Sequence, residues 1–266
     1  MREGSLVAFT LLTQAAVGTC WSLLALRPSA PAAGALLLVS FIAALAGLAA
    51  SFLHLGRPSN AWRALGNLRT SWLSREILFA SAFTGALGAS VFLSRLPGPP
   101  RSWTGLAEWA AGALGLALVW SMAMAYRLRT VPAWNAWTTN AAFFASALGL
   151  GAFSAAAVLA GLGGPEPLPA YPSGGLTLSA LLFHFVGVAA TLFWLRRLAS
   201  GGRAGRGIRP LLLARFTLSA LVLVAGARAL SAPGSARPLA VACLLAFAAE
   251  AAGRSLFYEA RVRVGL

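Results

Sequence analysis

The sequence contains no lysine and no aspartate among its 266 residues, and its only acidic side chains are six glutamates. Charged residues make up 10% of the chain, whereas a soluble domain has roughly 25%. So few charges cannot solvate the surface of an ordinary globular protein, and 59% of the residues are apolar. We therefore exclude the soluble globular class and expect a protein whose solvent is a lipid bilayer.

Cysteine is scarce as well. Cys20 and Cys243 are the two cysteines of the sequence, and each lies inside an apolar run. They cannot form a CxxC pair, a disulfide framework or the ligand set of an iron–sulfur cluster. The sequence also lacks a Walker loop, HExxH, GxSxG and a catalytic Cys/His arrangement. We expect any cluster that works with this protein to lie on another polypeptide, and we expect this one not to transform a terminal substrate itself.

Long apolar runs, separated by clusters of proline, glycine and arginine, fill the sequence. Each run approaches the roughly 20 residues that cross a bilayer as a helix. The first run is too long for a typical cleaved signal peptide, which favours a retained span. We expect an all-α fold, a polytopic membrane bundle of about eight transmembrane helices in a single integral membrane domain (residues 1–266). The predicted spans are residues 5–26, 33–55, 74–94, 103–127, 137–161, 174–196, 208–230 and 237–257.

The 21 arginines predict the orientation of the protein. Eight spans place both termini and the even-numbered loops on one side, and 15 arginines fall on or near that side, against four on the other. By the positive-inside rule both termini lie in the cytoplasm, in a multi-pass protein of the inner (cytoplasmic) membrane. The net charge of +15 would suggest a nucleic-acid binder in a soluble protein. Here we expect membrane lipid, and no nucleic acid, as a partner.

Ionisable side chains inside a membrane are costly and are therefore candidates for function. His54 is predicted to end the second span and Glu76 to open the third, so both lie at the same membrane face. Arg57, Trp72 and Arg75 come between them. Such a group suits a quinone headgroup, since a donor binds the carbonyl, a carboxylate or imidazole exchanges the proton, and a ring covers the quinone. The alternative is structural: Arg75 and Glu76 anchor the helix start, and His54 binds a carbonyl at the interface.

The remaining buried candidates favour structural roles. His184, near the middle of the sixth span, could join His54 as the axial pair of a b-type haem. The two histidines are predicted at different depths, which favours a packed, hydrogen-bonded core histidine. Glu250 and Arg254, four residues apart on the last span, are expected to pair with each other, and the alternative is a proton relay. Arg215 is expected to snorkel or to reach toward a neighbouring carboxylate.

Several motifs are familiar as a set. They are FTLLTQ at residues 9–14, SFLHLGRP at 51–58, SWLSRE at 71–76, YR at 126–127, PAWNAWT at 132–138 and GRSLFY at 253–258. Together they cover nearly the whole length, and the His-Leu-Gly and Ser-Arg-Glu pieces are the most specific. On these motifs the sequence resembles the DmsC family, the membrane anchor subunits of DMSO reductase-type molybdoenzymes.

The resemblance implies an eight-helix, haem-free anchor that binds a quinone, either menaquinone or ubiquinone. Such an anchor exchanges electrons with a four-cluster iron–sulfur subunit, which is linked to a catalytic subunit that holds a molybdopterin cofactor. The family's quinol-site histidine corresponds to His54 and its nearby glutamate to Glu76. Gln14, in the matching motif of the first span, is expected to belong to the same quinone site, as is Trp72. We expect His54 to bind a quinone carbonyl, Glu76 to relay protons, and Arg57 or Arg75 to hold the pocket or the partner.

The direction of electron flow depends mostly on the redox potentials of the other subunits, but one branch of the family gives an expectation. The context of Arg57 and of residues 72–76 looks closer to the anchors of sulfite-oxidising relatives than to the enterobacterial DMSO reductase anchor. Sulfite oxidation and sulfoxide reduction by the catalytic subunit both stay open. Two alternatives from other classes also remain: a haem b-containing, quinone-reactive cytochrome subunit, and a small polytopic transporter. A transporter more often shows inverted repeats and broken helices, which we do not find in the sequence.

Overall fold

The computed structural model describes residues 2–53, 66–97, 101–162, 170–199, 208–232 and 235–259. These residues form eight helices, each long and apolar enough to cross a membrane, so the predicted all-α membrane bundle is confirmed. The helices are α1 (Arg2–Leu26), α2 (Ala30–Phe52), α3 (Trp72–Leu93), α4 (Arg101–Tyr126), α5 (Trp137–Gly161), α6 (Ala170–Ala199), α7 (Ile208–Ser231) and α8 (Ala236–Glu259).

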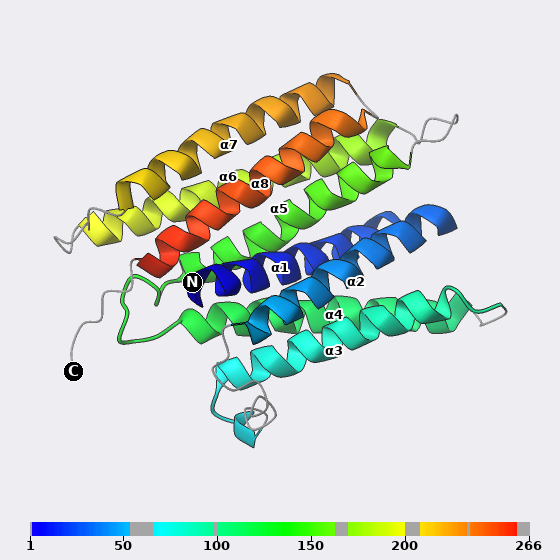
Figure 1. The fold of residues 1–266 in the computed structure, drawn as a ribbon, viewed down its shortest axis with the longest axis horizontal. Coiled ribbons are helices and arrows are strands. Elements are labelled where there is room, and N and C mark those ends of the chain that lie inside the picture. The colour runs from blue at the N-terminus through cyan, green and yellow to red at the C-terminus, as the bar shows by residue number, and fades with distance from the viewer. Residues whose placement is uncertain are drawn as a thin grey trace.

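The helices lie side by side in two groups, α1–α4 and α5–α8, which meet where α1 packs along α5 (Figure 1). Because consecutive helices alternate in direction, the start of α1 and the end of α8 lie at the same end of the bundle. We call this end the N-terminal face: α1, α3, α5 and α7 begin there, and α2, α4, α6 and α8 end there. Each site residue can be placed by its distance along a helix from this face.

Two glycines allow α1 and α5 to meet closely. A Cβ atom on Gly18 would overlap the Ala147 carbonyl, and one on Gly151 would overlap the backbone of Gly18. In lipid, where a hydrophobic driving force between helices is lacking, such small residues let backbones approach and gain van der Waals contact. The crossing of α1 and α5 therefore joins the two groups of helices.

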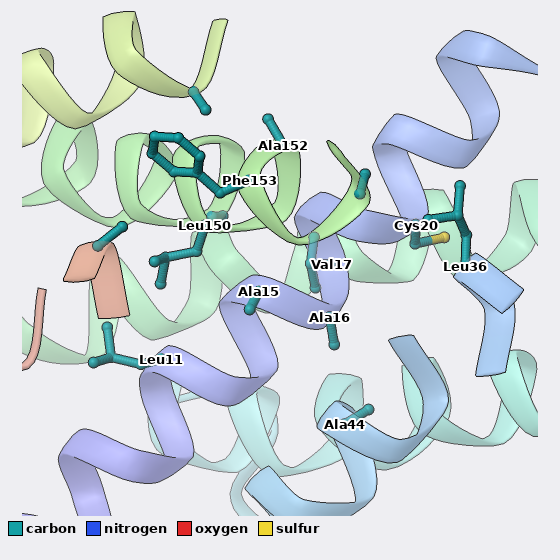
Figure 2. Packing of buried hydrophobic residues seen from close by; sticks show 14 of the residues in the cluster. Leu11, Ala15, Ala16, Val17, Cys20, Leu36, Ala44, Leu150, Ala152 and Phe153 are labelled. Carbon is teal, nitrogen blue, oxygen red and sulfur yellow. The ribbon is translucent and has the colours of Figure 1, made fainter. Parts of the chain in front are cut away.

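The core forms around α1. Figure 2 shows buried side chains of α1 together with those of α2 and α5, among them Val17, Leu36 and Phe153. Of the most apolar stretch of α1, 78% is buried inside the protein, against 22% for α7. Helix α7 thus presents most of its surface outward, while α1 lies at the centre of the packing. Polar side chains on α1 are consequently enclosed by protein.

Candidate functional site

The start of α3 is ordered by its own capping residue. Ser71 has an extended backbone (φ −109°, ψ 120°), and its hydroxyl accepts a hydrogen bond from the Ser74 N–H at 3.2 Å. Serine is preferred at this position because it satisfies an amide that has no partner within the helix. The cap begins α3 at the N-terminal face and places Glu76 just over one turn inside it.

Arg75 fastens the segment that precedes α3. Its Nε donates to the Leu68 carbonyl and its Nη2 to the Arg69 carbonyl, both at 2.8 Å. The guanidinium also lies 4.2 Å from the centre of the Trp72 ring, within the range of a cation–π contact. The structure thus brings Trp72 and Arg75 together as expected, but it uses two donors of Arg75 within the protein itself.

Glu76 is the ionisable side chain that the structure buries near this cap. It is 4% exposed, and among the described residues it has no hydrogen bond and no ion pair. Its carboxyl interacts electrostatically with the hydroxyls of Tyr126 and Tyr258, which share a hydrogen bond of 2.8 Å. An ionisable group inside a membrane-spanning helix is costly and rare, so Glu76 is a candidate for binding a ligand or exchanging a proton.

His54 and Arg57, the other half of the predicted site, lie outside the described residues. The structure describes α2 up to its cap at Leu53 and resumes at Gly66, shortly before α3. The end of α2 and the start of α3 both lie at the N-terminal face. A site shared by His54 and Glu76 therefore stays a prediction.

Gln14 is fully buried in α1 and binds a side chain of α8. Its Oε1 accepts a hydrogen bond of 3.0 Å from Arg254 Nη2, and its Nε2 has no partner among the described residues. The Arg254 guanidinium also lies 3.7 Å from the centre of the Phe143 ring. Gln14 is joined to the surroundings of Glu76 indirectly, through α8, which has Tyr258 one turn beyond Arg254.

The expected pairing of Glu250 with Arg254 is wrong. Glu250 Oε1 instead lies 2.8 Å from Arg215 Nη1 and 3.5 Å from His184 Nδ1, while Ser146 donates a hydrogen bond of 2.6 Å to Oε2. Of the two expectations for Arg215, snorkelling or reaching a carboxylate, the second is confirmed. Neighbouring helices supply partners that outcompete the residue one turn away on α8.

His184 is a hydrogen-bonded core histidine, as predicted from its place in the sixth span. Its Nε2 shares a hydrogen bond of 3.1 Å with Ser219, and its Nδ1 faces Glu250. Both ring nitrogens therefore have partners on other helices. Within the described ranges, no group of three or more His, Cys or Glu side chains could hold a metal ion.

An aromatic cluster at the N-terminal face was not singled out by sequence reasoning. The Trp134 indole stacks on Phe257 at 5.0 Å and donates a hydrogen bond of 2.7 Å to its carbonyl. Tyr126 packs edge-on against both rings, at 5.6 and 5.5 Å. The signal was present in the motifs at 126–127, 132–138 and 253–258, because these motifs contribute all of the rings.

A cavity lies at the opposite end of the bundle. It has a volume of about 760 Å³, and its lining includes Arg27, Arg95 and Glu108. Arg27 and Glu108 form an ion pair of 3.2 Å there. The sequence analysis did not predict a site at this face. Glu108 at this cavity therefore serves as a comparison when the assignment of Glu76 to the quinone site is tested.

Comparison with known proteins identifies relatives of this chain. It is 35% identical to the anaerobic dimethyl sulfoxide reductase chain YnfH of Escherichia coli K12 over 113 residues, 42% of this chain and 40% of the relative. It is 61% identical to the C subunit of the sulfite dehydrogenase of Allochromatium vinosum over 41 residues, 15% of this chain and 13% of the relative. It is 28% identical to the C chain of the anaerobic dimethyl sulfoxide reductase of Haemophilus influenzae over 148 residues, 53% of each.

The matched stretches thus span between 13% and 53% of these relatives' own lengths. No solved structure matches the sequence. A family model described as DMSO reductase anchor subunit (DmsC) matches residues 1–196, most of the sequence. With eight candidate membrane spans and this match, the protein is a multi-pass membrane protein that belongs to the DmsC family of DMSO reductase anchor subunits.

Proposed function

We propose that this protein is the quinone-binding membrane anchor of a multi-subunit oxidoreductase. In this role it exchanges electrons between the quinone pool and a partner iron–sulfur subunit, which is linked to a catalytic subunit that holds molybdopterin. Membership of the DmsC family and the names of the relatives support the proposal. The observation that carries the site is the buried Glu76 carboxyl, which has no ionic partner in the described part of the protein.

The residues at the N-terminal face fit a quinone. A bound quinone supplies a ring that takes up or releases two electrons and two protons. His54 donates a hydrogen bond to a ring carbonyl and exchanges a proton, and Glu76 relays protons from its buried position. Arg75 and Trp72 hold the segment that precedes α3, and Arg57 holds the pocket or the partner subunit. Gln14 acts at a distance, through its hydrogen bond to Arg254.

The test of the site is a pair of carboxylate substitutions, one at each end of the bundle. Glu76→Gln keeps the shape of the side chain and removes its exchangeable proton, so quinone-linked turnover is expected to fall by about 100-fold or more. Glu108→Gln is the matched control, since Glu108 is paired with Arg27 at the opposite cavity. Turnover is measured in membranes that hold the assembled complex, and His54→Ala is included as the second site variant.

Two results would overturn the site. Normal turnover in both Glu76→Gln and His54→Ala removes the assignment outright. Loss of turnover in Glu108→Gln alone moves the quinone to the opposite cavity. The arginine bias predicts that the N-terminal face is cytoplasmic, and reporter fusions at the two termini test that orientation separately.

Sulfite oxidation is favoured over sulfoxide reduction as the reaction of the complex. The stretch of 61% identity to a sulfite dehydrogenase subunit supports sulfite oxidation. Because a longer stretch matches a dimethyl sulfoxide reductase protein, sulfoxide reduction is tested as well. The complex is purified with its partners and assayed with sulfite plus a quinone analogue, and with dimethyl sulfoxide plus a quinol analogue. Molybdenum and iron–sulfur clusters without haem bands are expected. A b-type haem band would favour the cytochrome alternative, and a lone, metal-free protein would favour the transporter alternative.

A further inference from the structure

The second group of helices encloses a cluster of charged side chains that the quinone site does not use. Arg215 is 1% exposed, and Glu250 and His184 are also buried. At about 1.5 Å of rise per residue, Arg215 lies about 10 Å inside the start of α7, and Glu250 about 13 Å inside the end of α8. Charged groups at such depth are rare and mark ion or proton pathways in membrane proteins.

A cavity of about 50 Å³ adjoins this cluster. Arg215, Glu250 and Arg254 line its inner part, and Thr138 and Trp194 line it near the helix ends at the N-terminal face. Thr138 is the second residue of α5, and Trp194 is in the last two turns of α6. The lining residues thus come from α5, α6, α7 and α8, and they extend from near the helix ends at the N-terminal face to the charged cluster.

The walls of the cavity have hydrogen-bond donors without acceptors. Arg215 Nε and Nη1 and Trp194 Nε1 are buried, and none has a hydrogen-bond partner among the described residues. Arg215 Nη1 is close to Glu250, but its N–H does not point at the oxygen. Polar cavities retain water, whereas apolar ones stay dry, and one water needs about 10–15 Å³ of such volume. The cavity of about 50 Å³ has room for about three to five waters, which is too small for a quinone ring.

Buried polar side chains continue from the cavity toward the first group of helices. Arg254 lines the cavity and donates to Gln14 of α1. Tyr258, one turn beyond Arg254 on α8, shares a hydrogen bond of 2.8 Å with Tyr126 of α4. These bonds join the two groups of helices inside the membrane-spanning region.

We propose that this cavity is a hydrated proton inlet, in which water and the Glu250–His184 pair carry protons between the N-terminal face and the interior. The proposal rests on the function proposed above, because the quinone reaction is what needs the protons. Reduction of a quinone to its hydroquinone consumes two protons with two electrons, and oxidation releases them. The electrons pass to or from the partner iron–sulfur subunit, and the protons pass through the inlet to or from water.

The first experiment uses the unaltered complex, so that folding of a variant is not at issue. A cryo-electron microscopy map of the complex in lipid nanodiscs, at a resolution that shows ordered water, is expected to place water beside Arg215 Nε and Trp194 Nε1. A dry cavity would overturn the inlet. The quinone site is not involved in this measurement, so its result does not depend on whether Glu76 binds quinone.

The second experiment blocks the inlet in two ways. Glu250→Gln removes the ionisable group, and Ala142→Leu fills the cavity, which Ala142 lines. We expect kcat for quinone-linked turnover to fall by about tenfold or more, with a larger solvent deuterium isotope effect and an unchanged Kd for a quinone analogue. Gly149→Ala is the control, because its added methyl group meets only ordinary contacts at 3.5 Å and lies outside the cavity.

The outcomes separate the two proposals. Near-normal kcat in the assembled Glu250→Gln and Ala142→Leu complexes would overturn the inlet while leaving the quinone site intact. If Glu250→Gln does not assemble, Ala142→Leu decides the functional test, and the water map decides the occupancy of the cavity. Failure of the unaltered complex to bind a quinone analogue would overturn the function proposed above, and the inlet would lose the reaction that it serves.

Discussion

Arg215 of α7 lies 2.8 Å from Glu250 of α8, although Arg254 stands one turn from Glu250 on the same helix. Two glycines leave space for this arrangement. A Cβ on Gly253 would come within 3.2 Å of Arg215 Cζ, and one on Gly187 within 3.4 Å of both Arg215 Nη2 and Glu250 Oε1. The guanidinium of α7 therefore enters a gap between α6 and α8, and Arg254 turns toward α1 instead.

Removing one member of this ion pair should destabilise the protein strongly. Arg215→Ala leaves the Glu250 carboxylate buried beside His184 without its closest cation, which is expected to cost about 3–5 kcal/mol. The loss of unfolding free energy in the double variant Arg215→Ala/Glu250→Ala should be smaller than the sum of the losses in the two single variants, because neither charge is then buried without its partner. Unfolding of the purified protein in lipid nanodiscs measures both. Arg228→Ala, at an exposed position in the last turn of α7, is the control, and equal stability of Arg215→Ala and this control would contradict the prediction.

The hydrogen bond between Gln14 and Arg254 should tie α1 to α8. Gln14→Leu removes the acceptor of the buried, charged Arg254 donor. We expect the free energy of unfolding to fall by about 1.5–3 kcal/mol. Gln14→Glu keeps an acceptor and adds a charge opposite to that of Arg254, so it should be more stable than Gln14→Leu. The same unfolding measurement ranks the two variants. A Gln14→Leu protein as stable as the unaltered one would show that Arg254 finds another partner.

The crossing of α1 and α5 should reject any side chain at its two glycines. Gly18→Val places methyl groups against the Ala147 carbonyl, and Gly151→Val places them against the Gly18 backbone. Overpacking of this kind typically costs about 1–3 kcal/mol and occasionally more, and backbone on both sides leaves nothing flexible to yield. We expect loss of the folded monodisperse protein in size-exclusion chromatography. Gly85→Ala, with nothing within 4 Å of the added atom, should elute normally, and normal elution of Gly18→Val would refute the prediction.

Arg75 should act mainly by holding the segment before α3. Arg75→Ala removes two hydrogen bonds from a charged donor and the contact with Trp72. We expect the free energy of unfolding to fall by at most roughly 1.5–3 kcal/mol for each of the two bonds. Arg75→Lys keeps the charge but not the planar fork that reaches two carbonyls, so it should be intermediate. Limited proteolysis between α2 and α3 reports release of the segment. Equal cleavage rates in the unaltered protein and Arg75→Ala would rule out the clamp.

The helices were predictable because membrane length and hydropathy are local properties of the sequence. The ends of the helices were harder to predict. The second span is predicted at residues 33–55, whereas the structure has α2 from Ala30 to Phe52. The proline at residue 31 suggests a break in the sequence, whereas proline fits the first turn of a helix, where its missing N–H is not needed. At the candidate site, the sequence predicted that the end of the second span and the start of the third lie at one membrane face, whereas the cap at Ser71, which begins α3 at Trp72 and not at residue 74, was seen only in the structure.

The amino-acid pattern alone predicted eight apolar helices of membrane-spanning length, the place of Glu76 near the start of α3, and the motifs of the DmsC family. Which buried polar groups meet became known only from the packed helices: Gln14 with Arg254, Glu250 with Arg215, and His184 with Ser219. The reason is that lipid and protein interior are both apolar, so hydropathy does not specify how a membrane helix is rotated about its axis. That rotation depends on close contacts such as the one between Gly18 and Gly151, which exist only once the helices pack.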